Sequence, residues 1–294
     1  MSLIEIEKKH DYLPDSPFKT RNHLDKHPLF ETNRVKELLR SLPRNCVEIR
    51  LSQSTSTHDG NYRRGIVLED EDPVEAFEKL QERPRWILLK SVWLNDKEYA
   101  QMIKEYIQEL SSHFDDMKDL SDFGCWIFLS SPHSVVHFHM DTDYGFVNEI
   151  RGSKKVFIYR PETLDEYERE KVAYTHQQDQ VYKPEYEKFL FPSVDLNGGE
   201  TAFLPLYAPH RVVNGDSVCI AINIGFHTKK SRRQKKVHMV NFDLRSLGLE
   251  PTPFNRYPIL DSVKARSFIF FRLKNKLLKA LRPKIAMNKD VSYR

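Results

Sequence analysis

Cysteine is scarce in this chain, with only three among its 294 residues. Cys46, Cys125 and Cys219 are odd in number and widely spaced, and no Cys-x-x-Cys pair occurs. This argues against a secreted disulfide framework and a zinc knuckle, because both depend on closely grouped cysteines. The pattern favours a cytoplasmic protein without disulfide bonds, in which Cys125 and Cys219 are small buried hydrophobic residues of predicted strands.

Long apolar runs are also missing. The residues after Met1 do not form the apolar segment of a signal peptide, and no uninterrupted apolar run is long enough to span a membrane. We find no internal repeats, low-complexity segments or nucleic-acid-binding motifs. With 39% hydrophobic and 12% aromatic residues, the chain can nevertheless bury a large core. We therefore expect one enlarged domain or two small ones, without a transmembrane segment and without nucleic acid as a partner.

Charge is distributed unevenly along the chain. Residues 229–294 contain 18 Lys and Arg against 4 Asp and Glu, whereas residues 1–228 contain 28 against 38. Lys229–Lys236 is a dense basic run, and Val263–Leu281 has the pattern of a basic amphipathic helix. Such a tail can bind an acidic partner or an anionic membrane surface. It can equally neutralise the acidic N-terminal part or form a homodimer through its apolar face, and we favour these two over nucleic acid.

Hydrophobic periodicity in the N-terminal part predicts a mixture of helices and strands. Helices are expected over 33–40 and 73–81. A third is expected after Asn95, which would be its N-cap, with Glu98 three residues later as in a capping box. Strands are expected over 47–51 and 86–90. Residues 1–30 are polar and predict an irregular arm. The polar stretch 52–64 predicts a long loop that is either functional or simply solvated.

The first candidate metal ligands occur in a predicted strand that begins near Val135. His139 and Asp141 are two residues apart, so their side chains point to the same face of an extended strand and can reach one metal ion together. His137 is a rival ligand at the same spacing. These residues can also be ordinary strand histidines bonded to backbone carbonyls, with Asp141 in a turn.

A third ligand is expected about seventy residues later. Gly198–Gly199 predicts a turn, Thr201–Leu204 a strand, and the prolines at 205 and 209 a loop that delivers His210. A β-rich run follows at 217–226. Two imidazoles and one carboxylate on one face would leave three positions of an octahedral iron open.

The two segments together resemble the jumonji-C branch of the iron(II)/2-oxoglutarate oxygenases. That family has a His-x-Asp strand, a strand that ends in Gly-x-Lys, and a Gly-Glu segment followed by Phe, Pro and His. The matching residues here are His139, Asp141, Gly152, Lys154, Gly199, Glu200, Phe203, Pro205 and His210. The resemblance covers about a third of the chain, and Ala208–Pro209 stand where the family often has aromatic residues.

The resemblance implies a fold that is mainly β with flanking helices: a double-stranded β-helix (a cupin-type jelly roll). An oxygenase domain at 1–228 would comprise an N-terminal α/β extension (1–115) and a jelly-roll core (116–228) with a helical insert (161–191). The basic C-terminal helical region would occupy 229–294.

The resemblance also implies the cofactors. Iron(II) would bind His139, Asp141 and His210, together with 2-oxoglutarate and O2. Lys154 would pair with the far carboxylate of 2-oxoglutarate, since the arginine that other relatives place near position 220 is Ile220 here. Asn148 and Asn223 would lie near the cosubstrate.

The expected reaction is hydroxylation of a C–H bond, in an amino-acid side chain of a protein, a peptide or a small biosynthetic intermediate. The alternatives are a cupin metalloenzyme that works without 2-oxoglutarate, and a non-catalytic jelly-roll protein that binds a partner through its basic tail.

Overall fold

A computed structural model of the protein describes residues 2–6, 12–51, 66–118, 120 and 122–281. The chain divides into two compact units, one formed by Met1–Asp165 with Gln177–Ser231 and the other by Glu166–His176 with Arg232–Arg294. The predicted domain boundary lay at 228/229, with the whole insert at 161–191 in the first domain. In the structure, residues 166–176 of this insert group with the C-terminal residues from 232 onward. The predicted polar loop at 52–64 lies outside the described residues.

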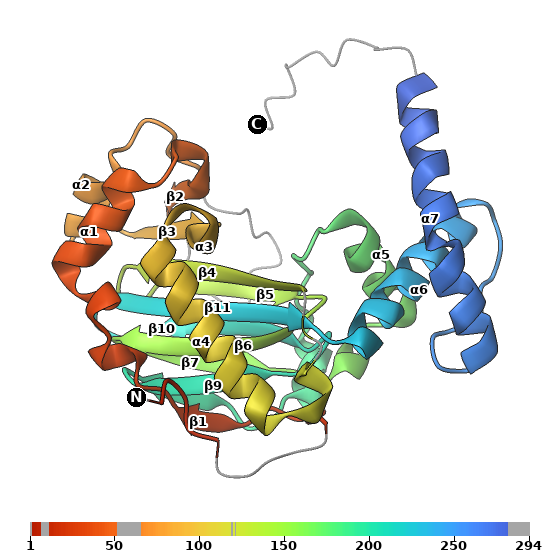
Figure 1. Ribbon diagram of the computed structural model, residues 1–294, viewed down its shortest axis with the longest axis horizontal. Coiled ribbons are helices and arrows are strands. Elements are labelled where there is room, and N and C mark those ends of the chain that lie inside the picture. The colour runs from red at the N-terminus through yellow and green to blue at the C-terminus, as the bar shows by residue number, and fades with distance from the viewer. Residues whose placement is uncertain (1, 7–11, 52–65, 119, 121, 282–294) are drawn as a thin grey trace. The chain divides into compact units, whose positions relative to one another are not determined.

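The first unit contains two antiparallel sheets (Figure 1). Their strands are β1 (Lys19–Arg21), β2 (Val47–Leu51), β3 (Arg85–Lys90), β4 (Asp122–Ser130), β5 (Val135–Met140), β6 (Tyr144–Arg151), β7 (Ser153–Ile158), β8 (Val194–Asn197), β9 (Glu200–Leu204), β10 (Pro209–Asn214) and β11 (Cys219–His227). One sheet has the order β1-β9-β6-β11-β4-β3-β2, and the other has the order β5-β10-β7-β8. Strands β4 to β11 thus supply four strands to each sheet, which is a jelly roll. The predicted fold class is confirmed.

The central strands β6 and β11 of the larger sheet are buried on both faces, because both sides of this sheet are covered. Phe146, Ile222 and Ile224 belong to a core that also includes residues of the helices. Val147, one position further along β6, belongs to a second core with Val156 and other residues of the smaller sheet. Successive side chains of a strand point to opposite faces, so one strand serves both cores. Along each strand, only every second side chain can therefore point into the space between the two sheets.

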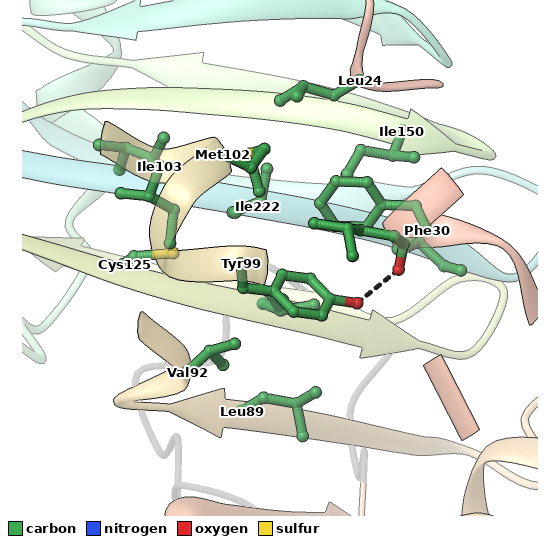
Figure 2. Packing of buried hydrophobic residues seen from close by; sticks show 14 of the residues in the cluster. Leu24, Phe30, Leu89, Val92, Tyr99, Met102, Ile103, Cys125, Ile150 and Ile222 are labelled. Carbon is green, nitrogen blue, oxygen red and sulfur yellow. Dashed lines mark hydrogen bonds between the residues drawn. The ribbon is translucent and has the colours of Figure 1, made fainter. Parts of the chain in front are cut away.

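Helix α4 (Lys97–His113) packs on the outer face of the larger sheet. Figure 2 shows its Tyr99, Met102 and Ile103 beside Cys125 and Ile222 of the strands. The helix begins one residue later than predicted, because its N-cap is Asp96, whose side chain accepts from the backbone N–H groups of Glu98 and Tyr99. Asn95, the predicted cap, instead ends the preceding helix α3 (Val92–Asn95).

The N-terminal extension largely follows the predicted pattern. Helix α1 spans Thr32–Ser41, α2 spans Pro73–Glu78, and strands β2 and β3 lie at the edge of the larger sheet. The prediction of an irregular arm over 1–30 was wrong in part. Strand β1 pairs with β9, and a bridge joins Ile4 to Asn22. The polar segment Lys19–Arg21 is a strand because it forms hydrogen bonds with β9, which is far away in the sequence.

The second unit is helical. It contains α5 (Glu166–Thr175), most of α6 (Lys229–Ser246) and α7 (Pro258–Leu281). Tyr174 of α5 stacks on Phe242 of α6, with ring centroids 4.7 Å apart. Helix α7 includes the predicted amphipathic segment and carries the exposed side chain of Phe270. No helix in the described part of the chain is long and apolar enough to cross a membrane.

Candidate metal centre

Strand pairing in the smaller sheet brings the two histidines together. His139 near the end of β5 lies directly opposite His210 at the start of β10, and their ring centroids are 4.0 Å apart. His210 is therefore a strand residue, and its predicted placement on a loop was wrong. Directly opposed residues of antiparallel strands have neighbouring Cβ atoms, so a separation of about seventy residues in sequence becomes side-chain contact.

Asp141 follows the last residue of β5 and completes a group of three donors. Its Oδ2 lies 4.0 Å from Nε2 of His139 and 3.7 Å from Nε2 of His210. Ligand atoms of the three residues all lie within 4.8 Å of one another. His137, the rival ligand, is not part of this group in the described structure.

Backbone carbonyls set the orientation of both imidazoles. Nδ1 of His139 lies 2.7 Å from the carbonyl oxygen of His137, and Nδ1 of His210 lies 3.1 Å from that of Ala208. A ring nitrogen facing a carbonyl carries the proton, which leaves Nε2 as the unprotonated nitrogen that a metal needs. Burial, and then the neighbouring His139, lower the pKa of His210 to about 4. His210 is therefore neutral at physiological pH.

Gln178 orients the carboxylate. Its Nε2 donates to Oδ1 of Asp141 at 2.6 Å, so Oδ2 remains directed at the two histidines. The backbone of the same segment is bonded to β5, since Met140 N donates to Gln178 O and Gln180 N donates to Phe138 O. Gln178 was not predicted from the sequence, because it lies in the insert at 161–191 and no motif marks it.

The donor set fits a divalent transition metal. Two neutral imidazole nitrogens and one carboxylate oxygen are the ligands that non-haem iron takes when it keeps positions open for other molecules. Carbonyl and amide partners hold all three side chains in place from behind, as is usual for metal ligands. His139, Asp141 and His210 are thus the residues that could hold the ion.

The three side chains line a cavity of about 240 Å³. Its walls include aromatic residues of β3 and β4, namely Trp86, Trp126 and Phe128. Gly225 also lines it, and an added Cβ there would lie 2.4 Å from the Asp143 carboxylate, so a larger residue would require the Asp143 side chain to move. A strand was predicted over 86–90, but these walls were not identified from the sequence.

Lys154 also lines this cavity. Its Nζ lies 2.7 Å from Oε2 of Glu149, and this ion pair is buried, with side-chain exposures of 7% and 0%. Lys155 is directed elsewhere and lies 3.5 Å from Asp195. The pleat of β7 therefore places Lys154, and not its neighbour, in the same cavity as the three donors. No role for Glu149 was predicted from the sequence.

The two asparagines have different surroundings. Asn223 lines the cavity, and its buried Oδ1 has no hydrogen-bond partner among the described residues. Asn148 does not line it; its Oδ1 accepts from Tyr106 at 2.7 Å and Thr201 at 2.8 Å, and its Nδ2 donates to the carbonyl of Ile222. The structure thus brings Asn223 to the site and keeps Asn148 in the core beneath α4.

A second group of donors lies within the helical unit, where Glu166, Glu170 and His238 approach one another. Its carboxylates already have protein partners. Glu170 accepts from Arg245 at 2.7 Å and from Asn241 at 3.0 Å, and Glu166 lies 3.3 Å from His238. An ion-pair network explains this group without a metal.

Several solved structures are similar to this chain at low sequence identity. A solved structure of ycfD from Escherichia coli has a TM-score of 0.49 and 16% identity, covering 87% of this chain and 64% of that chain. A structure of YcfD, described as a ribosomal oxygenase, in complex with cobalt and 2-oxoglutarate has a TM-score of 0.44 and 15% identity, covering 88% and 63%. The DMSP lyase DddQ from Ruegeria pomeroyi matches over only 36% of this chain and 39% of that chain, with 11% identity and a TM-score of 0.25.

This chain spans less than two thirds of the length of the ycfD structures. No curated protein matches it. The model of the cupin-like domain matches residues 2–232, which include all strands of the described residues and all three metal-ligand candidates. The chain belongs to the cupin-like domain family.

Proposed function

We propose that the protein is an iron(II)/2-oxoglutarate-dependent oxygenase that hydroxylates a C–H bond. The observation that carries the proposal is one cavity lined by His139, Asp141, His210 and a buried lysine, Lys154. The three donors suit iron, and the lysine suits the far carboxylate of a dicarboxylic cosubstrate. The substrate we propose is an amino-acid side chain, in a protein, a peptide or a small biosynthetic intermediate.

Each group has a distinct task in this proposal. Iron with 2-oxoglutarate and dioxygen would supply the oxidation, in which one oxygen atom enters succinate, the other enters the hydroxylated product, and carbon dioxide is released. Lys154 would hold the far carboxylate, and the unpartnered Oδ1 of Asn223 offers an acceptor in the same cavity. The walls formed by Trp86 and Trp126 would pack against the substrate and keep water away.

Anaerobic titration of the iron-loaded protein with 2-oxoglutarate tests the reaction class. We expect the weak visible metal-to-ligand charge-transfer band to appear in the wild type and to be lost in His210→Ala. His113→Ala is the matched control, because His113 ends α4 and does not line the cavity. Stoichiometric iron binding without the band would rule out chelation of 2-oxoglutarate.

The ion pair between Lys154 and Glu149 favours a second candidate function. Since Lys154 already has a counter-ion, its charge is balanced without a dicarboxylate, as in a cupin metalloenzyme that needs no cosubstrate. Lys154→Ala separates the two functions. Loss of 2-oxoglutarate affinity with iron binding retained supports the oxygenase, whereas activity that needs no 2-oxoglutarate supports the second candidate.

A further inference from the structure

Lys154 contacts a buried carboxylate as well as the cavity. Glu149 is 0% exposed and Lys154 is 8% exposed, and of the two only Lys154 lines the cavity. The distance of 2.7 Å between Nζ and Oε2 is that of a close ion pair. Lysine has three N–H donors, so contact with Glu149 leaves donors available for a ligand in the cavity.

Charge balance at this lysine changes when a dicarboxylate binds. In the structure, the negative charge of Glu149 balances the positive charge of Lys154. A ligand carboxylate at Lys154 would bring two negative charges to one positive charge in a buried place. A buried charge without an opposite charge beside it is strongly unfavourable. Either the ligand binds weakly, or one carboxylate becomes neutral.

The surroundings of Glu149 identify the group that can become neutral. From β7 it faces Lys154 and from β11 it faces Cys219, while Glu200 lies opposite on β9 and is itself paired with Lys19 at 2.8 Å. Burial raises the pKa of Glu149 above its usual value, against the opposing effect of Lys154. Burial and the charge of Glu149 raise the pKa of Cys219 to about 12, so this thiol stays neutral and takes no part.

We propose that Glu149 takes up one proton when 2-oxoglutarate binds, so that Lys154 exchanges its buried counter-ion for the carboxylate of the cosubstrate. This inference rests on the proposed function. It makes Glu149 a positioning residue that couples cosubstrate affinity to pH. Where Glu149 is ionised in the free protein, the dissociation constant of 2-oxoglutarate rises about tenfold for each pH unit.

Calorimetric titration of the full-length, metal-loaded protein with 2-oxoglutarate tests this coupling without relying on activity. Performed anaerobically in two buffers of different ionisation enthalpy, it measures the protons taken up on binding. We expect uptake approaching one proton in the wild type and none at this site in Glu149→Gln. The ratio of the two dissociation constants should then grow about tenfold per pH unit. Comparing the two proteins cancels any protonation change of the metal ligands.

Two controls isolate the site. Glu170 of the helical unit is another fully buried carboxylate, and it forms an ion pair with Arg245. Glu170→Gln should therefore leave the proton uptake as in the wild type. Pyruvate has the 2-oxo acid group but lacks the far carboxylate, so its binding should show no difference between wild type and Glu149→Gln.

Tight binding with equal proton uptake in wild type and Glu149→Gln would overturn the inference and leave the proposed function intact. Absence of 2-oxoglutarate binding in both proteins, with metal bound, would overturn the proposed function and the inference with it.

Discussion

Replacing Gln178 by alanine tests whether the insert at 161–191 takes part in metal binding. The side-chain amide of Gln178 donates at 2.6 Å to Oδ1 of Asp141, and this bond directs Oδ2 toward the two histidines. A hydrogen bond to a charged group contributes about 1.5–3 kcal/mol. Loss of a group that orients a metal ligand lowers metal affinity about 10- to 100-fold. The two estimates agree, so we expect a loss of metal affinity in this range.

The backbone contacts of the segment should survive the substitution, because Gln178 binds β5 through its carbonyl oxygen and not through its side chain. The assay is the dissociation constant of cobalt(II) or anaerobic iron(II), measured by competition with a chelator of known affinity. Gln180→Ala is the matched control, since its backbone N–H bonds to β5 in the same way and its side chain is not bonded to Asp141. Equal metal affinity in the wild type and Gln178→Ala would refute the reasoning.

Two further predictions concern stability. Asn148→Ala should leave the hydroxyl groups of Tyr106 and Thr201 without their buried acceptor, and each such group costs about 1–3 kcal/mol. We therefore expect the free energy of unfolding to fall by about 2–6 kcal/mol in denaturant titration, while the folded fraction keeps its 2-oxoglutarate affinity. A stable variant that has lost this affinity would contradict the placement of Asn148 outside the cavity. Burial raises the pKa of the Glu166 carboxyl, but the stronger opposing effect of its partners, His238 foremost, lowers this pKa to about 2 from the ordinary 4.5. A carboxyl whose pKa is lower in the folded than in the unfolded protein stabilises the fold above about pH 4.5. We expect about 3 kcal/mol of the free energy of unfolding to be lost as the pH falls toward 2. Unfolding measurements at a series of pH values should show that Glu166→Gln lacks this loss.

The strands and the spacing of the ligands could be predicted from local sequence. His139 and Asp141 lie two residues apart in a β-rich run, and alternation alone places both side chains on one face. Strand β2 has the predicted bounds, and β3 begins one residue earlier than predicted. Apolar runs bounded by turn residues depend on few neighbours, so these predictions needed no tertiary information.

Residues whose role depends on distant partners could not be predicted in this way. Asn148 and Asn223 both lie on central strands and look alike in sequence, yet only Asn223 lines the cavity. The register of a strand with its neighbours decides which of its side chains point between the two sheets, and a shift of one residue would turn either asparagine to the opposite face. Gln178 has no local signal, because its task exists only where its segment meets β5.

From the sequence alone, residue chemistry and short-range spacing predicted His139, Asp141 and His210 as candidate ligands, and the resemblance to the oxygenase family implied the jelly roll and the role of Lys154. Tertiary structure decided that His210 faces His139 across two paired strands, and that Gln178 bonds to Asp141. It also decided that Lys154 has Glu149 as a buried counter-ion. These contacts depend on strand register and burial, and neither property can be predicted from the residues of a single segment.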